Sequence, residues 1–483
     1  MKHYGGLDEW VFQSDIPTLK SSYKLLIVPT AEFTYKVQKK SNLGITIKPL
    51  PDVGGVYYEM NNVPALRIEP YMDARRDYLQ KVTFQLSGVI NVFGSKEDVN
   101  TTWRSLAYDL MTQKEFGSQL DKDLKVEELD ELVKKESSAT GKVKIIYNYV
   151  KKNFAWNGYY GKYASDGLKA VLDRKKGSVG DLNLLLINFL KTAGIETYPV
   201  LAADRDFGKI DTLYPFMERF NKVVAFSIAD GKQFILDVSE ENCPAGLTPY
   251  SLLNTRAFLV DKKNYNLIKI ATSTKSFRNM ININGEIKPG GQLVAAGKIE
   301  SYEYAKQLYT DKLKQNAKKF VSEFFEQPYE GLTIDSTYDK NRDDEMLPLE
   351  QGIKFHQQLN ESGGFVLLNY NLFMGYTKTP FTSNNRFTNI NFGYPYNISY
   401  KAHIKLPPGS KVDNLPENDV IEYNNGMIKL IRNLDFNNGE IEITILFSQT
   451  VTLVLAERYN ELKDFYKKMV DLLNEPVVIK LGN

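Results

Sequence analysis

The sequence predicts an α+β protein in which a central α+β region is flanked by two β-sandwich-like regions. Short β-rich runs separated by prolines occupy the first hundred residues. Apolar residues then recur at helical spacing until about residue 193, and strand-like alternation follows that stretch. Helices followed by an antiparallel sheet are typical of an α+β domain. We therefore expect domains at residues 1–96, 97–275 and 276–483.

The first region is expected to form part of a β-sandwich. Its predicted strands lie at residues 23–28, 55–59, 65–69 and 81–93. In the last of them, Val82, Phe84 and Leu86 alternate with polar neighbours, as in a strand with one buried face. Because these runs begin so close to residue 1, we expect this sandwich to be truncated.

The central region begins with helices and ends with strands. The helical spacing of apolar residues predicts helices over 103–111, 124–135, 141–153, 166–172 and 179–193. Gly194 is expected to end the last helix in the left-handed conformation. Strands are predicted at 197–203, 220–228, 233–238 and 256–260. The sequence Ala229-Asp230-Gly231 suits a tight hairpin between the second and third of these strands.

The last region is predicted to be a β-rich domain with two helices. A hairpin is expected between residues 282–287 and 292–300, because Lys288-Pro289-Gly290-Gly291 separates two alternating runs. We expect helices over about 302–325 and 459–472. Further strands are predicted at 398–406, 441–455 and 477–481.

Composition excludes several classes of function. With 61 Lys and Arg against 59 Asp and Glu, the net charge of +2 gives no overall basic field for nucleic acid. The longest apolar stretch, 441–456, alternates and is interrupted by charged and polar residues, so we expect no transmembrane helix. One cysteine and three scattered histidines (His3, His356 and His403) argue against a zinc site. We expect neither a metal nor a cofactor.

Five segments of the central region form a recognisable series. They are residues 143–154, 167–177 (Gly-Leu-Lys-Ala-Val-Leu-Asp-Arg-Lys-Lys-Gly), 178–186 (Ser-Val-Gly-Asp-Leu-Asn-Leu-Leu-Leu), 220–226 and 234–238. Their order and content resemble the transglutaminase-like superfamily of papain-type folds. In that family a cysteine opens the helix after the glycine, a histidine lies on the first following strand and an aspartate on the next. A helix N-terminus acidifies such a thiol, the histidine accepts its proton and the carboxylate orients the ring.

Carried onto this sequence, the resemblance places the nucleophile at Val179, the base at Lys222 and the orienting acid at Asp237. An isopropyl group cannot attack a carbonyl, and no histidine occurs between residues 101 and 260. We therefore expect a degenerate triad. Lys222 could act as a base only if burial lowered its pKa, and a nearby Asp237 would do the opposite. We favour a Lys222–Asp237 salt bridge.

Other candidates for chemistry are weaker. Ser178 is expected to cap the helix that follows it, because no histidine is near enough in sequence to activate it. A lone Cys243 is expected to be inert packing. Asp181 and Asn183, in the first helical turn, are assigned to capping and to the helix dipole.

An aromatic cluster lies between the predicted helices 141–153 and 166–172. It consists of Trp156, Tyr159, Tyr160 and Tyr163. Exposed aromatic rings beside a cleft bind sugars or peptides, whereas buried rings fill a core. In a chain with 30 Tyr and 26 Phe such clusters arise by chance, so core packing is the favoured interpretation and binding the alternative.

Two flanking segments extend the resemblance. Residues 57–69 look like a β-rich domain of unknown function that precedes this core in exported Bacteroidetes proteins. Residues 406–416, with helix 459–470, are similar to a companion C-terminal domain. The resemblance implies a periplasmic or cell-surface location, although residues 1–10 contain no secretory signal.

The function expected from this sequence is that of a pseudoenzyme. We expect a non-catalytic transglutaminase-like protein that acts as a scaffold or as a binding module for peptide, protein or glycan. The alternative is an active cysteine protease or a transglutaminase-type acyl-transfer hydrolase, because family members with the full triad are described as thiol proteases.

Overall fold

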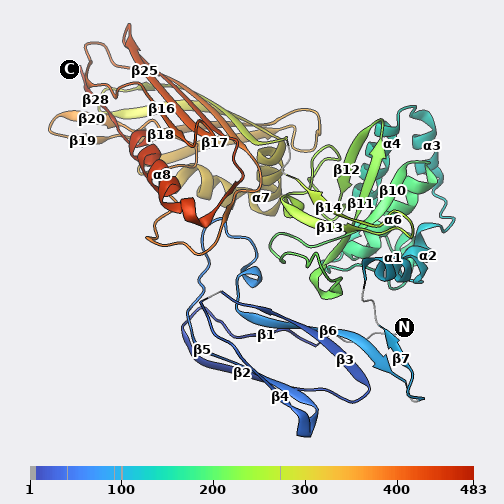
Figure 1. The fold of residues 1–483 in the computed structure, drawn as a ribbon. Helices are drawn as coiled ribbons and strands as arrows, with labels where there is room; N and C mark the ends of the chain where they lie inside the picture. The colour runs from blue at the N-terminus through green and yellow to red at the C-terminus, as the bar shows by residue number, and fades with distance from the viewer. Residues whose placement is uncertain (1–6, 41, 92, 99–101, 272–273, 483) are drawn as a thin grey trace. The chain divides into compact units, whose positions relative to one another are not determined.

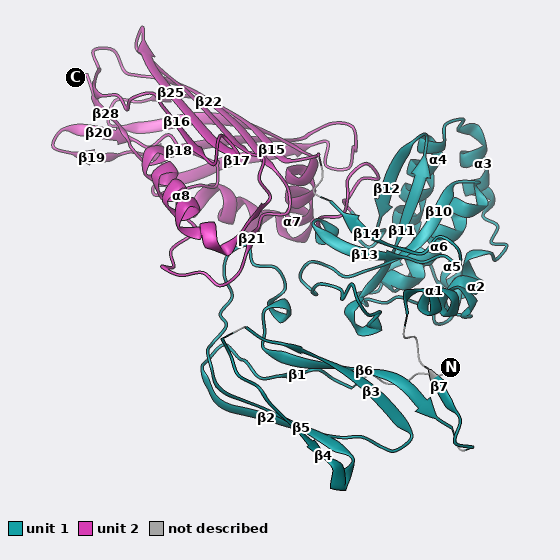
Figure 2. Ribbon diagram, in the orientation of Figure 1, with its two compact units in different colours: residues 1–241, 251–271 teal, residues 242–250, 272–483 magenta. Residues whose placement is uncertain are grey.

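The computed structural model describes residues 7–40, 42–91, 93–98, 102–271 and 274–482. It divides into two compact units, which Figure 2 shows in different colours. Unit 1 comprises residues 1–241 and 251–271, and unit 2 comprises residues 242–250 and 272–483. The predicted α+β fold class is confirmed. The division into domains 1–96, 97–275 and 276–483 stays a prediction.

The first part of unit 1 contains two small antiparallel sheets (Figure 1). One has the order β1-β6-β3, with β7 on β6, and the other has the order β2-β5-β4. Buried side chains from both sheets share one core, among them Leu25, Tyr58 and Phe84. The strands are β1 (Trp10–Val11), β2 (Thr18–Leu26), β3 (Ala31–Gln38), β4 (Thr46–Leu50), β5 (Gly55–Val63), β6 (Lys81–Ile90) and β7 (Lys96–Asp98).

One predicted strand in this part is wrong. Residues 65–69 form no strand in the structure. Pro64 and Pro70 bracket the segment, and because proline has no N–H the run is too short to form a ladder. Strands β3 and β4 were not predicted, although Ala31, Phe33, Tyr35 and Val37 alternate with polar residues along β3. In β4 the alternation is short and Pro49 interrupts it.

The second part of unit 1 packs helices against an antiparallel sheet of order β12-β11-β10-β13-β14. Helix α6 is its centre, since every residue from Val179 to Leu190 is buried and the helix contacts α4, β10 and β11 (Figure 1). The helices are α1 (Trp103–Thr112), α2 (Gly117–Leu120), α3 (Glu127–Lys135), α4 (Ala139–Asn153), α5 (Leu168–Arg174) and α6 (Val179–Thr192). The strands are β8 (Ala155–Trp156), β9 (Lys176–Gly177), β10 (Glu196–Ala202), β11 (Lys222–Ala229), β12 (Lys232–Leu236), β13 (Thr255–Leu259) and β14 (Asn266–Ile270).

The turn chemistry of this part agrees with the sequence. Asp230 and Gly231 both have positive φ, of 49° and 72°, in the hairpin that joins β11 to β12. Gly194 has φ 76° directly after α6, as expected for a residue that ends a helix.

Unit 2 is built on a sheet of order β17-β18-β16-β15-β22-β26-β25-β24. The predicted β15–β16 hairpin is confirmed, and β15 also pairs in parallel with β22. Helix α7 (Glu303–Val321) packs on β15 and β16, and α8 (Tyr459–Leu473) packs on β24. The main strands are β15 (Phe277–Ile287), β16 (Gln292–Tyr302), β17 (Leu332–Lys340), β18 (Leu349–Gln358), β22 (Tyr396–Lys405), β24 (Asp419–Tyr423), β25 (Ile428–Asn437) and β26 (Glu440–Gln449).

Shorter strands complete unit 2. A second sheet has the order β19-β20-β28-β23, and β21 pairs with β27. They are β19 (Asn360–Ser362), β20 (Phe365–Leu368), β21 (Ile390–Asn391), β23 (Lys411–Asn414), β27 (Leu453–Val454) and β28 (Val477–Lys480). Within the described residues, no helix has the length and apolar character that crossing a bilayer requires.

Candidate functional site

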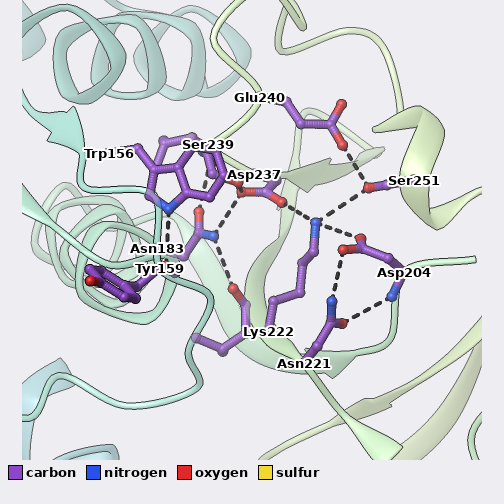
Figure 3. A network of polar contacts seen from close by, with 12 residues as sticks. Trp156, Tyr159, Asn183, Asp204, Asn221, Lys222, Asp237, Ser239, Glu240 and Ser251 are labelled. Atoms are coloured by element: carbon purple, nitrogen blue, oxygen red, sulfur yellow. Dashed lines mark hydrogen bonds and ion pairs between the residues drawn. The ribbon is translucent and has the colours of Figure 1, made fainter. Parts of the chain in front are cut away.

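A buried lysine lies at the centre of the candidate site (Figure 3). Lys222 begins β11, and Asp237 follows the last residue of β12, so the hairpin brings the two together. The Lys222 Nζ atom lies 2.8 Å from Asp237 Oδ2 and 2.6 Å from Asp204 Oδ1. The side chains of Lys222 and Asp237 are 2% and 0% exposed. The predicted Lys222–Asp237 salt bridge is thus confirmed, and Asp204 is a second carboxylate that the sequence did not reveal.

The Asp237 carboxylate is fixed by donors from two sides. Asn183 Nδ2 donates to Oδ1 at 2.9 Å. Ser239 donates to the same oxygen through its backbone N–H at 3.0 Å and its hydroxyl at 2.6 Å. The Tyr147 hydroxyl donates to the Asp237 backbone carbonyl at 3.0 Å. Three donors on one buried oxygen stabilise the ionised form.

A second set of contacts surrounds the lysine on its other side. Ser251 Oγ lies 3.3 Å from Lys222 Nζ and donates to Glu240 Oε1 at 2.6 Å. Asn221 Nδ2 donates to Asp204 Oδ2 at 2.8 Å, and Asn221 Oδ1 accepts from the Asp204 backbone N–H at 3.0 Å. The ammonium therefore lies between the carboxylates of Asp237 and Asp204. Among the described residues, no group of three or more His, Cys, Asp and Glu side chains could hold a metal ion.

The charges around Lys222 and Asp237 determine the protonation states of these two residues. Burial lowers the pKa of Lys222, but the carboxylates of Asp237, Asp204 and Glu240 outweigh burial and raise that pKa above its ordinary value. Burial raises the pKa of Asp237, but the Lys222 ammonium and the hydrogen bonds from Asn183 and Ser239 outweigh it and lower that pKa. Lys222 stays protonated at neutral pH, so it has no lone pair with which to act as a general base.

Val179 lies where the resemblance places a nucleophile, at the first residue of α6. It is fully buried, and its N–H donates to the Tyr159 carbonyl at 3.1 Å. Two residues further along, Gly161 forms a parallel bridge with Lys222. The 159–161 segment therefore connects the Val179 position to Lys222.

The capping interpretation holds for Ser178 and Asp181 but not for Asn183. Ser178 Oγ accepts from the Asp181 N–H at 3.2 Å, and Asp181 Oδ2 accepts from the Ser178 N–H at 2.9 Å, which together form a capping box. Asn183 is completely buried and bridges to the β11–β12 hairpin through the Val223 carbonyl as well as Asp237. The sequence did contain a signal for this role, because Asn183 is a polar residue among the apolar residues of the helix.

Cys243 is part of unit 2, outside the Lys222 cluster, which belongs entirely to unit 1. Its side chain is completely buried, and its sulfur lies 3.3 Å from the Leu247 carbonyl. A buried, hydrogen-bonded thiol matches the packing role expected for it.

The aromatic cluster is exposed for three of its four members. Trp156, Tyr159 and Tyr160 are 40%, 73% and 55% exposed, so core packing is wrong for them. Trp156 ends the two-residue strand β8, and Tyr159 and Tyr160 lie on the loop that follows. Trp156 Nε1 donates to the Tyr159 carbonyl at 3.0 Å. Trp156 and Tyr160 make an edge-to-face contact at 5.7 Å. Only Tyr163 packs inward, against Phe116.

Tyr160 joins the aromatic loop to the buried cluster. Lys222 Nζ lies 5.8 Å from the centre of the Tyr160 ring, a cation–π distance. Burial and the negative charge of Asp204 raise the pKa of the Tyr160 hydroxyl. The exposed aromatic loop therefore contacts the buried ionic cluster through Tyr160.

Comparison with known proteins identifies the central fold. Residues 128–219 match the transglutaminase-like superfamily. This segment includes Val179 but ends before Lys222 and Asp237. Residues 364–479 match a domain of unknown function with a solved structure, DUF3858. No curated protein matches the chain.

Solved structures support the same fold. A "putative protease" from Parabacteroides distasonis ATCC 8503 aligns over 99% of this chain and 75% of its own, with a TM-score of 0.58 and 11% identity. A "putative cysteine protease" from Cytophaga hutchinsonii aligns over 48% of this chain and 74% of its own, with a TM-score of 0.20 and 9% identity, which is too low to support an argument. The first likeness shows a shared fold. The family match over residues 128–219 shows that unit 1 contains a transglutaminase-like domain.

Proposed function

We propose that this transglutaminase-like core is non-catalytic and serves as a binding module for peptide, protein or glycan ligands. One observation carries the proposal. Where the family's histidine is expected, Lys222 is buried between Asp237 and Asp204, at 2.8 and 2.6 Å, with its pKa raised. An ammonium ion in this setting accepts no proton, and Val179 offers no atom that could form an acyl bond.

Exposure of the aromatic loop supports the binding half of the proposal. Trp156, Tyr159 and Tyr160 present rings to solvent beside the position where relatives perform chemistry. Aromatic rings provide stacking faces for sugars and apolar contacts for peptides, at low entropic cost. The backbone bridge between Gly161 and Lys222 connects this loop to the polar network around Lys222.

Catalysis is tested on the purified chain with fluorogenic peptides and with amine incorporation into a glutamine substrate. We expect turnover no greater than that of buffer, and no labelling of the native protein by iodoacetamide, because Cys243 is its single thiol and is buried. Labelling should occur only in urea. The active cysteine-hydrolase alternative predicts the opposite, namely native labelling and turnover that the Cys243→Ala variant abolishes.

Binding is tested separately with peptide and glycan arrays. Ligands captured by the native chain should be lost, at least tenfold in affinity, in the Trp156→Ala and Tyr159→Ser variants. Tyr108, 58% exposed on α1, offers a matched control, and its replacement by Ala should leave binding unchanged. Arrays that remain blank, or equal losses in the control, would reject the aromatic loop as the binding surface.

A further inference from the structure

A cavity in unit 1 adjoins the Lys222 cluster but is lined by other residues. Its volume is about 300 Å³, and its walls come from the 73–77 segment that precedes β6, from residues 205–212 and from residues 254–256 at the start of β13. The Arg205 N–H donates to the Ser251 carbonyl at 2.7 Å, and its carbonyl accepts from the Ala74 N–H at 3.0 Å. Backbone hydrogen bonds thus connect these walls to one another.

The lining is charged, with cations in excess. Arg205, Lys209 and Arg256 face two carboxylates, Asp73 and Asp77. Asp73 forms ion pairs with Arg205 and Lys209, at 3.6 Å each. Asp77 instead accepts the Lys209 backbone N–H with both oxygens, at 2.9 and 3.0 Å. The Asp77 oxygens are therefore directed at a backbone amide and not at the cationic side chains.

A second layer of positive charge lies behind the cavity wall. A Cβ on Gly208 would come within 3.0 Å of Arg76, so Arg76 packs directly behind that residue. Glu9 there is shared by Lys81 at 2.9 Å, Arg76 at 3.2 Å and Arg219 at 3.8 Å. The two layers contain six cationic side chains and three carboxylates. Such an excess around a walled cavity attracts anions.

The neutral side chains that line the cavity, together with its volume, restrict the class of ligand that it could bind. Thr212 and Thr255 also line the cavity. Thr255 Oγ1 donates to the Leu252 carbonyl at 2.6 Å, which leaves its lone pairs to accept a hydrogen bond. A volume of 300 Å³ corresponds to about ten waters at roughly 30 Å³ each, close to the size of one sugar ring with a charged group.

We propose that this cavity binds an anionic monosaccharide, a sugar that carries a carboxylate or a phosphate. The arginine side chains recognise the anion, because a guanidinium matches the geometry of carboxylate and phosphate oxygens. The threonines bind the sugar hydroxyls. This site is distinct from the aromatic loop, and its existence does not depend on the proposed function.

The experiment is isothermal titration calorimetry on the full chain at low ionic strength. The probes are glucuronate, glucose 6-phosphate, inorganic phosphate and uncharged glucose. We expect saturable, sub-millimolar binding of at least one anionic sugar, which identifies whether carboxylate or phosphate is preferred. Phosphate alone and glucose should bind at least tenfold more weakly. No saturable binding of either anionic sugar, or glucose that binds equally well, would overturn the proposal.

Two variants of lining residues and one control variant test whether the sugar binds in this cavity. Arg256→Gln and Lys209→Gln change exposed cations of the lining and should each weaken binding about tenfold. Lys269 pairs with Arg256 across β13 and β14 but is not part of the lining, so Lys269→Gln should change the affinity less than twofold. Circular dichroism verifies that all three variants fold. An equal loss in Lys269→Gln would show general attraction of anions and would refute the cavity as the site.

Discussion

Unit 1 buries two lysines whose surroundings differ in one respect. Lys222 faces Asp237 and Asp204 within 2.8 Å, whereas Lys81 shares the carboxylate of Glu9 with Arg76 and Arg219. The pKa of Lys222 is raised. Burial, followed by the positive charge of Arg219, lowers the pKa of Lys81 to about 8.

The comparison shows that burial alone does not determine the protonation of a lysine. Both side chains are removed from solvent, being 2% and 0% exposed. The balance of charge around each ammonium determines the direction of its pKa shift. At Lys222 that balance stabilises the charged ammonium, whereas at Lys81 the charge is held at a cost.

The largest effect should follow removal of the Lys222 charge. Lys222→Met leaves Asp237 and Asp204 buried without their cation, which should lower the free energy of unfolding by about 3–5 kcal/mol at pH 7. Urea titration followed by tryptophan fluorescence measures this directly, because Trp10, Trp103 and Trp156 all belong to unit 1.

Two controls sharpen that measurement. Lys191 pairs with Asp121 at 2.8 Å on the surface, so Lys191→Met should cost less than about 1 kcal/mol. Adding Asp237→Asn to Lys222→Met should restore part of the loss, because one buried charge is removed. If Lys222→Met cost no more than Lys191→Met, the ion-pair network would not be the stabilising feature we describe.

The sequence predicted this part of the fold well because its signals are local. Helical spacing, the glycine after α6 and the Asp230-Gly231 turn each depend on a few adjacent residues, and all three agree with the structure. The Lys222–Asp237 pair was also predictable, since one hairpin fixes the distance between the two residues.

What the sequence could not show depends on long-range contacts. Asp204 meets Lys222 only because β10 pairs with β11, and nothing in its neighbours distinguishes it from a surface aspartate. Exposure of Trp156 and Tyr159 likewise depends on how the loop after α4 is held, not on the rings themselves. The charged cavity requires residues 73–77 to meet residues 205–212 and 254–256, which follow more than a hundred residues later in the chain.

A smaller effect should appear in the pH dependence of stability. Lys81 has a folded pKa of about 8 against an ordinary value of 10.5, so between these values the unfolded chain binds more protons than the folded chain. Stability contributed by Lys81 should therefore rise as the pH increases from about 8 to 10.5 and should be constant below that window. At about 1.36 kcal/mol for each pKa unit, the difference between about 8 and 10.5 sets an upper limit of roughly 3 kcal/mol on this gain.

The Lys81→Met variant isolates this contribution. Its free energy of unfolding, measured by tryptophan fluorescence from pH 7 to 10.5, should lack the rise that the native chain shows. The difference between native and variant curves gives the titration of Lys81 alone. A native curve that is parallel to the variant curve over this window would mean that Lys81 titrates normally in the folded state.

The smallest effect should come from Arg76, one of the cations that compete for Glu9. Its charge contributes to the lowered pKa of Lys81, so Arg76→Gln should move that pKa upward, toward its ordinary value, and the rise in stability should begin at a higher pH. Arg76 also stacks on Phe207 at 4.8 Å, a contact that glutamine only partly replaces, so a uniform loss of stability is expected at every pH. The effect of the Arg76 charge on Lys81 is measured by the shift of the pH window in which stability rises, and not by the uniform loss of stability. If the pH window did not move, burial and Arg219 would be sufficient to set the pKa of Lys81. At Lys222 no single cation has a comparable influence, because carboxylates dominate the surroundings of its ammonium group.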